Sequence, residues 1–479
     1  MFGLGKPVGA AGPINTIQWL TEELNDFLSS NKRKLMLTGD KYYEVDNDIF
    51  QRKITRPTEK GGEEEVKYKA NNKLAHAFYK NLVDEKVNYL LGKEYTLKSD
   101  NEEYIKKLDW TLGEEFLDIL NELGYEASNK GLGWLHIFIN EEAKLDYMVI
   151  PSEQVIPIWK DRRHKVLDRL IRLYDVLVYE GTEKKTVTKI ELWYPDKVEY
   201  YVKDGEKILL DSERYLNIEG DAGHYTKDGK QSVWNRVPFI AFKNNRKELG
   251  DIKFIKSLVD GYDLSRSDVA NFIEEVKNLI YVLKGYDGDE LSKFMEYLNY
   301  YRAIVVDEDG AVDTLNPTID VEAIKIHYEQ LKRDINECGQ GVSKDLDKFG
   351  SAPSGIALKF LYSGLDLKCN SLEVLFKKAF KELLYFINIY LSESSQGSYK
   401  DVPVELIFNK NIKINETETI SNCVNSKGVI SNKTIMSNHP WVKDPVAEQE
   451  QLDKEKEEFG INFDKIPLPH KKVGEGDEE

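Results

Sequence analysis

Two stretches of sequence decide the architecture, residues 252–276 (IKFIKSLVDGYDLSRSDVANFIEEV) and residues 321–341 (VEAIKIHYEQLKRDINECGQG). In both, apolar side chains recur at alternating steps of three and four residues, which predicts two helices with a narrow apolar seam. Gly339 and Gly341 end the second helix. The predicted seam consists of Ile255, Val259, Tyr262, Val269 and Ile273 in the first helix and Ile324, Tyr328, Leu331 and Ile335 in the second.

This seam has two interpretations. The two helices are core helices that pack on each other, or they pack against copies of themselves in a ring. Both arrangements bury a stripe with the same period, so periodicity does not separate them.

Between the two helices lies an insertion, residues 277–319. Its sequence predicts a strand over 278–286, a helix over 287–301, and two short strands over 302–316 with a turn at Asp309-Gly310. Such a β-α-β unit is either a small structural excursion or a docking module that projects from the far end of the helices.

Outside this region the chain alternates between helical and β-rich segments. Helices are expected over 15–39 and 71–91, and short β-branched and aromatic runs between 133 and 243 predict antiparallel meanders. Gly341, Gly350, Pro353 and Gly355 predict a loop over 341–355. Ser354 is then expected to cap a long helix that ends near Leu391, with a candidate kink at Gly364. The expected class is α+β.

Composition excludes several classes of protein. The 479 residues suggest about three domains. They carry 67 Lys and Arg against 84 Asp and Glu, a net charge of -17, which argues against a protein that coats nucleic acid but not against one that lets DNA slide past. The three cysteines are far apart in the sequence, so we expect no disulfide scaffold. The sequence has no apolar run long enough for a membrane span. The N-terminus lacks a secretory signal, so synthesis in the cytosol is expected.

Catalytic patterns are missing from the sequence. It has no Walker loop, no HExxH, no GxSxG, and no GxGxxG followed by a βαβ unit. We expect a structural role for His76, and the paired carboxylates Asp345 and Asp347 are too common in so acidic a chain to predict a metal site. We therefore expect no cofactor and no metal, and a structural or interaction protein rather than an enzyme.

Six segments carry a resemblance to a known family. They are residues 41–54 (KYYEVDNDIFQRKI), 71–97 (NNKLAHAFYKNLVDEKVNYLLGKEYTL), 237–275 (VPFIAFKNNRKELGDIKFIKSLVDGYDLSRSDVANFIEE), 351–369 (SAPSGIALKFLYSGLDLKC), 403–422 (PVELIFNKNIKINETETISN) and 428–455 (GVISNKTIMSNHPWVKDPVAEQEQLDKE). In this order and spacing the sequence resembles the portal proteins of tailed bacteriophages, in the group typical of phages of Gram-positive hosts. The resemblance covers roughly residues 15–460.

The resemblance implies a ring of twelve subunits at one vertex of the capsid, through which double-stranded DNA enters during packaging and leaves during ejection. It implies a virion protein assembled in the host cytoplasm, with the terminase large subunit, a head-tail adaptor, scaffold and major capsid protein as partners. The implied segments are a wing (1–250 and 356–415), stem helices (251–276 and 320–340), a clip (277–319), a tunnel loop (341–355), a crown (416–460) and an acidic, disordered tail (461–479).

Site residues also follow from the resemblance. The tunnel loop is expected to face DNA through Lys344, Asp345, Asp347, Lys348, Gly350 and Pro353. The lysines would touch phosphates, and the aspartates would keep each contact weak. The clip is expected to dock its partners through Tyr286, Asp289, Glu290, Phe294, Tyr297, Asp307 and Asp309.

Two alternatives remain open. One is a ring component of the phage neck other than the portal, although the insertion between two seam helices argues against it. The other is a DNA-processing subunit of the packaging machine, which would need a metal-binding carboxylate cluster or, for a motor, a Walker loop.

Overall fold

The computed structural model describes residues 16–58, 61–66, 69–180, 183–205, 207–216, 222–276, 280–284, 311–315, 320–342, 355–410, 416–442 and 444–459. The chain divides into two compact units, residues 1–343 with 364–411 and residues 344–363 with 412–479. Helices and sheets occupy largely separate stretches, and the strands pair antiparallel in every described sheet. This confirms the expected α+β class. None of the described helices has the length and apolar character of a membrane span.

The first unit begins with two helices, α1 (Thr16–Ser29) and α2 (Asn31–Tyr43). The predicted single helix over 15–39 is therefore wrong at Ser30, whose backbone is extended (φ -66°, ψ 145°). The Ser30 hydroxyl accepts a hydrogen bond from the Arg33 amide at 3.1 Å, so this residue caps α2 and interrupts the helix. A 3-10 turn, Asp48–Gln51, and a small hairpin of β1 (Thr55–Pro57) and β2 (Glu63–Glu65) follow.

Three helices form the centre of this unit: α3 (Phe78–Leu91), α4 (Glu102–Leu112) and α5 (Phe116–Lys130). The prediction of a helix over 71–91 is wrong in its first turns, because α3 begins at Phe78, and neither α4 nor α5 was predicted. Gly124 of α5 lies against α3, where a Cβ atom would stand 2.5 Å from Leu91 Cδ1, so a larger residue would force the Leu91 side chain to move. α5 ends at Gly131, which adopts a left-handed conformation (φ 89°).

Two antiparallel sheets confirm the predicted meanders. A three-stranded sheet has the order β13-β4-β5, formed by β4 (Leu132–Ile139), β5 (Leu145–Ile150) and β13 (Phe239–Lys243). A five-stranded sheet has the order β10-β9-β8-β7-β6, formed by β6 (Val155–Trp159), β7 (Leu167–Glu180), β8 (Glu183–Trp193), β9 (Val198–Asp204) and β10 (Lys207–Leu210). Short elements join them: the 3-10 turns Ser152–Gln154 and Ser212–Tyr215 and the hairpin of β11 (Tyr225–Lys227) and β12 (Lys230–Ser232).

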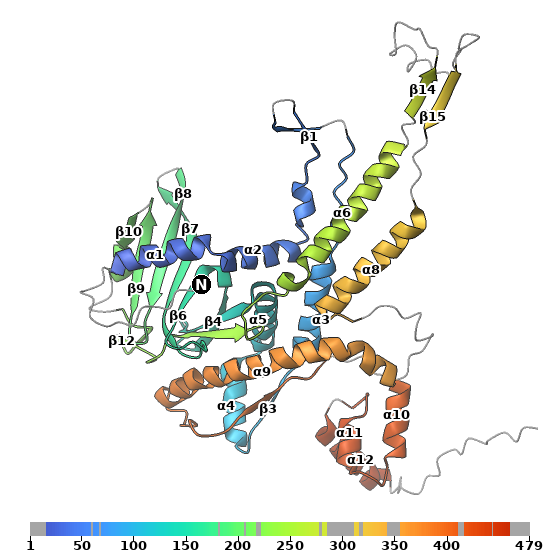
Figure 1. The fold of residues 1–479 in the computed structure, drawn as a ribbon. Coiled ribbons are helices and arrows are strands. Elements are labelled where there is room, and N and C mark those ends of the chain that lie inside the picture. Colours follow the sequence, from blue (N-terminus) through green and yellow to red (C-terminus); the bar gives the residue numbers. More distant parts are fainter. Residues whose placement is uncertain are drawn as a thin grey trace, which may run out of the picture. The chain divides into compact units, whose positions relative to one another are not determined.

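Two apolar clusters hold these layers together. In one, Trp134 of the three-stranded sheet is packed in the same cluster as Leu170 and Trp193 of the five-stranded sheet. In the other, Leu20 and Leu24 of α1 are fully or almost fully buried with Ile156, Ile171, Ile190, Leu192, Tyr201 and Ile208. Helix α1 therefore covers one face of the five-stranded sheet, across which it lies in Figure 1. Burying side chains of this size stabilises the fold by about 1.5–3 kcal/mol each.

Three long helices complete the first unit: α6 (Ile252–Val276), α8 (Val321–Gly339) and most of α9 (Gly355–Glu393). Beyond α6 and before α8, the strands β14 (Ile280–Lys284) and β15 (Ala311–Leu315) pair with each other, with Lys284 opposite Ala311. Phe376 of α9 packs on β13 of the three-stranded sheet, where its ring lies 5.0 Å from the Phe242 ring. After α9, β16 (Glu405–Ile407) pairs with β3 (Thr96–Lys98).

The second unit is helical in its described residues beyond α9. It contains α10 (Glu416–Asn425), α11 (Asn432–Ser437) and α12 (Pro445–Phe459). Ser431 caps α11 by accepting a hydrogen bond from the Thr434 amide at 3.2 Å. The tail expected over 461–479 lies outside the described residues.

Candidate functional site

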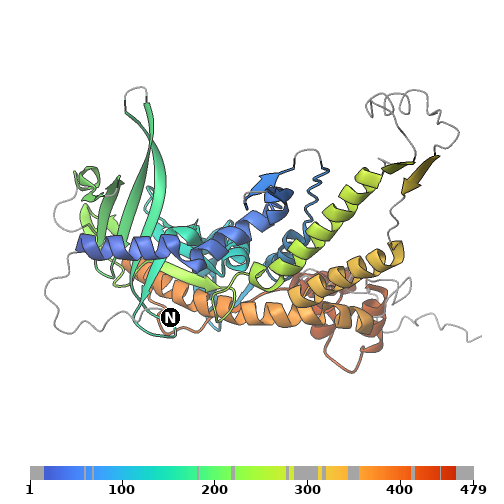
Figure 2. The same cartoon turned by 45° about the horizontal axis from the view of Figure 1, so that its top comes forward.

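The helix pair α6 and α8 is the candidate site, and the two helices lie side by side (Figure 1, Figure 2). Tyr262 and Tyr328 bring their rings to 5.7 Å at the contact between the helices. The Tyr328 hydroxyl donates a hydrogen bond to the Ser265 carbonyl at 3.0 Å, and the Arg266 guanidinium lies over the Tyr328 ring at 4.9 Å. Aromatic packing and directional polar contacts thus join α8 to α6.

The predicted seam residues are not buried to the same degree along this pair. Ile255, Val259 and Ile335 are buried in the single chain. Tyr262, Val269, Ile324, Tyr328 and Leu331 are half-buried, and Ile273 is 57% exposed. Packing inside one chain therefore accounts for the seam at the start of α6 and the end of α8. A contact with a neighbouring subunit along the rest of the seam stays a prediction.

A second stripe on α6 is polar, and the apolar spacing of the sequence did not predict it. Asp263, Ser267 and Asn271 are buried at steps of four residues. Asp263 accepts a hydrogen bond from Asn47 Nδ2 at 2.6 Å and lies 2.8 Å from His76 Nδ1. Burial raises the pKa of the Asp263 carboxyl, which its bonds to Asn47 and His76 partly offset. His76 thus has the structural role expected for it.

The same stripe explains why α3 starts later than predicted. The Asn72 amide donates to Asn271 Oδ1 at 2.6 Å, and the Leu74 amide donates to Ser267 Oγ at 3.0 Å. These bonds hold residues 71–74 along α6 in a non-helical conformation, because side chains of another helix satisfy their backbone donors. In the sequence, Asp263, Ser267 and Asn271 recur at helical spacing. Polar residues with this spacing are typical of a solvent-exposed helix face, so the spacing did not indicate that they are buried.

A buried charge network anchors the start of α6. Asp251 Oδ2 accepts bonds from Lys86 Nζ of α3 at 3.0 Å and from Lys368 Nζ of α9 at 2.9 Å. Asn244 Nδ2 donates to Asp251 Oδ1 at 2.8 Å, and Lys368 also donates to the Gly339 carbonyl at the end of α8, at 2.9 Å. We call Asp251, Lys86, Lys368 and Asn244 the anchor network. It connects α3, α6, α8 and α9 through one carboxylate.

Electrostatics keep the Asp251 carboxylate of the anchor network ionised. Burial raises the pKa of the Asp251 carboxyl, but the ammonium groups of Lys368 and Lys86 outweigh burial and hold the pKa well below its ordinary value. Burial lowers the pKa of Lys86, and the negative charge of Asp251 raises it again in part, so that the pKa stays below its ordinary value. Each charge is tolerated in the interior only because its partner is present.

Another carboxylate, Glu248, connects the N-terminal helix α2 to strand β13 of the three-stranded sheet. It accepts hydrogen bonds from Lys32 Nζ of α2 and Lys243 Nζ of β13, both at 2.9 Å, and lies 2.6 Å from His164 Nδ1. Burial raises the pKa of Glu248, but Lys32 and Lys243 outweigh it, so the pKa falls to about 2. Since this pKa is below that of the unfolded chain, Glu248 stabilises the fold above pH ~4.5 and loses that contribution as pH falls toward 2.

We expect Glu248→Gln to lower the free energy of unfolding by on the order of 2–3 kcal/mol at pH 7. The wild-type protein should lose that stability between pH ~4.5 and pH ~2, and the variant should show a flatter profile in this window. Denaturant midpoints measured by tryptophan fluorescence from pH 2 to pH 7 give the comparison. Glu114→Gln, at an exposed carboxylate, is the matched control and should follow the wild type. A profile of Glu248→Gln that parallels the wild type would contradict the role of this carboxylate.

The remaining predicted site residues lie outside the described residues. These are the tunnel-loop residues Lys344, Asp345, Asp347, Lys348, Gly350 and Pro353 and the clip residues Tyr286, Asp289, Glu290, Phe294, Tyr297, Asp307 and Asp309. Their flanks are described: the Val342 amide donates to Glu85 Oε2 at 3.2 Å, which fixes the start of the expected loop to α3. Among the described residues, no group of three or more His, Cys, Asp or Glu side chains is placed to hold a metal ion.

Comparisons with known proteins agree with the resemblance. The family model of SPP1 Gp6-like phage portal proteins matches residues 29–459. The portal protein of Bacillus phage SPP1 is 30% identical over 461 residues, covering 92% of this chain and 91% of that protein. The portal protein of Clostridium phage phiCD119 is 32% identical over 449 residues, covering 90% and 95%. A chain from the neck of an empty gene transfer agent particle aligns with a TM-score of 0.43 and 11% identity, covering 75% of this chain and 88% of that chain.

Proposed function

The chain belongs to the SPP1 Gp6-like family of phage portal proteins, and from that premise we propose that its copies form a ring of twelve at one capsid vertex. Portal proteins of this family are structural components of the virion rather than catalysts. The family match over residues 29–459 carries the proposal and favours a portal over another neck component or a DNA-processing subunit. Double-stranded DNA passes through the ring during packaging and ejection.

In this ring, α6 and α8 form the stem around the channel. The anchor network supports this role, because it joins the base of the stem to α3 and α9 through charges that cannot separate without a large cost in free energy. A rigid stem holds the channel open while DNA moves. The acidic balance of the chain, -17, keeps the wall from binding phosphates tightly.

The tunnel loop, residues 341–355, supplies the DNA contacts. Lys344 and Lys348 touch phosphates, and Asp345 and Asp347 limit the hold of each contact. The crown, residues 416–460, faces the inside of the capsid, where scaffold and major capsid protein are the neighbours.

The clip, residues 277–319, docks the terminase large subunit and later the head-tail adaptor. Lys284 and Ala311 pair at one end of the β14–β15 ladder, so the chain leaves and returns at adjacent points. A two-residue Asn-Gly turn can therefore replace residues 285–310 and close the hairpin.

We expect this clip-deleted variant to form rings of wild-type size in negative-stain images. Its affinity for the terminase large subunit should fall by on the order of a hundredfold, because the contact residues of the docking surface are gone. Pull-down and interferometry with purified terminase give the measurement, and Glu114→Gln, at an exposed carboxylate outside the clip, is the control. Wild-type protein that forms only monomers would refute the ring, whereas deleted rings that bind terminase normally would refute the docking role alone.

A further inference from the structure

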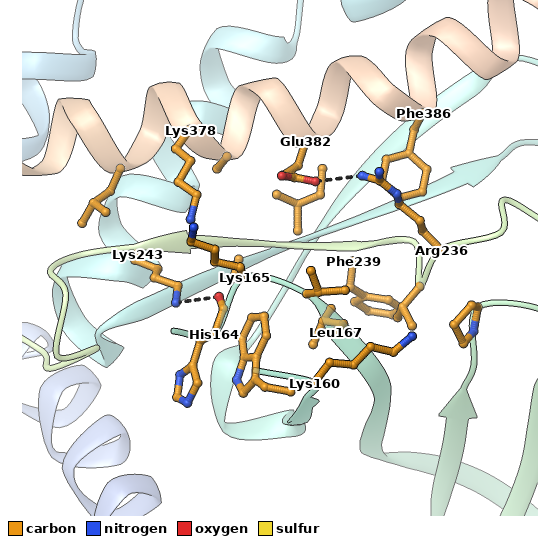
Figure 3. Close-up of a pocket in the computed structure, with 18 of the residues that line it drawn as sticks. Lys160, His164, Lys165, Leu167, Arg236, Phe239, Lys243, Lys378, Glu382 and Phe386 are labelled. Carbon is orange, nitrogen blue, oxygen red and sulfur yellow. Dashed lines mark hydrogen bonds and ion pairs between the residues drawn. The ribbon is translucent and has the colours of Figure 1, made fainter. Parts of the chain in front are cut away.

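A pocket opens on the first unit between residues 159–167, residues 235–243 and helix α9. Its volume is about 560 Å³, within the usual range for ligand sites. Much of its lining is apolar and includes Trp159, Leu167, Val237, Phe239, Leu375 and Phe386. Figure 3 shows Leu167 and Phe239 among the residues below α9.

The charged lining of this pocket is mostly basic, in contrast to the acidic chain. Its cationic side chains are Lys160, Lys165, Arg236, Lys243 and Lys378, and Glu382 is the only carboxylate among the described residues that line it. Partners neutralise two of the cations. Arg236 pairs with Glu382 at 3.0 Å and stacks on the Tyr385 ring at 3.7 Å, and Lys243 pairs with Glu248 at 2.9 Å.

The ammonium groups of Lys165 and Lys378 have no ion-pair partner within 4 Å among the described residues. Figure 3 shows the two side chains pointing toward one another, Lys378 from α9 and Lys165 from the loop before β7. Two like charges facing one another repel, and a negative group between them would turn this repulsion into attraction. Lys160 lies at the same pocket and forms a long ion pair with Asp168 at 3.9 Å.

We propose that this pocket binds a short acidic peptide segment of a partner protein. A carboxylate of the segment lies between Lys165 and Lys378, and a neighbouring apolar side chain covers the apolar lining beside Leu167. A DNA backbone fits less well, because it offers no apolar group for this lining. The inference rests on the pocket alone and does not depend on the proposed portal function.

The test measures binding of a fluorescein-labelled decapeptide of Glu, Asp, Phe and Leu by anisotropy. Lys165→Glu/Lys378→Glu should weaken binding at least tenfold relative to wild type, since two attractive contacts become repulsive. Lys106→Glu/Lys400→Glu changes the net charge equally at exposed lysines outside the pocket, and should bind as the wild type does. Raising the salt concentration should weaken wild-type binding.

Further variants and ligands distinguish specific binding in the pocket from attraction by the overall charge and from DNA binding. Lys165→Gln/Lys378→Gln, a milder variant, should also lose affinity, and thermal melting should show all variants folded. Equal loss in the pocket and control variants would overturn the proposal, because bulk charge would then explain the binding. So would equal binding of a peptide with Gln and Asn in place of Glu and Asp. A 20-base-pair duplex that binds at Lys165 and Lys378 while the peptide does not would also overturn it.

Discussion

Replacing Asp251 by Ala is expected to lower the free energy of unfolding by about 3–5 kcal/mol, the largest stability effect that we predict for a single side chain. The variant leaves the Lys86 ammonium in the interior, where its side chain is only 1% exposed, without its carboxylate partner. The variant also removes the carboxylate that pairs with Lys368, the lysine whose ammonium group donates to the Gly339 carbonyl at the end of α8. Denaturant midpoints followed by tryptophan fluorescence and circular dichroism measure the loss.

Two further variants show whether the loss comes from the anchor network. Asp268→Ala removes another carboxylate of α6, which pairs with Arg52 but is 53% exposed, and should cost no more than ~1 kcal/mol. Lys86→Met in the Asp251→Ala background should recover part of the loss, because the uncompensated charge is then gone. If Asp251→Ala costs no more than Asp268→Ala, the anchor network does not hold the stem helices to α3 and α9.

Replacing Ile273 by Asp is expected to abolish ring assembly while the subunit stays folded. Ile273 belongs to the predicted seam, yet it is 57% exposed in the single chain, so a charge there costs the subunit little. At a contact between subunits, the same carboxylate would be buried without a partner in every copy of the interface. Size-exclusion chromatography with light scattering and negative-stain imaging would show free subunits in place of rings.

Ile326→Asp is the matched control, because Ile326 is a 54% exposed isoleucine of α8 that lies outside the predicted seam. It should assemble as the wild type does. Normal rings from Ile273→Asp would show that this part of the seam does not face a neighbouring subunit. Failure of both variants would instead show that the whole outer surface of the pair is sensitive to charge.

The elements with a strong local period could be predicted from the sequence. The apolar spacing of α6 and α8 predicted both helices, and the β-branched runs between 133 and 243 predicted antiparallel strands. The order of six segments indicated the portal family, which the match over residues 29–459 shows. The start of α3 was mispredicted, because the apolar period continues through Leu74 although the backbone of residues 71–74 bonds to side chains of α6.

The sequence by itself determined the helix pair, the strand-rich segment, the class and the family, because each depends on the local spacing or order of residues. Only the tertiary structure decided which charges are buried and paired. Lys86, Asn244, Asp251 and Lys368 come from distant parts of the chain, and in the sequence each resembles an ordinary solvated polar residue. Lys165 and Lys378 also come from distant parts of the chain, and only the folded chain brings them to one pocket. A polar side chain has the same local pattern whether water or another segment binds it, so only the folded chain distinguishes the two.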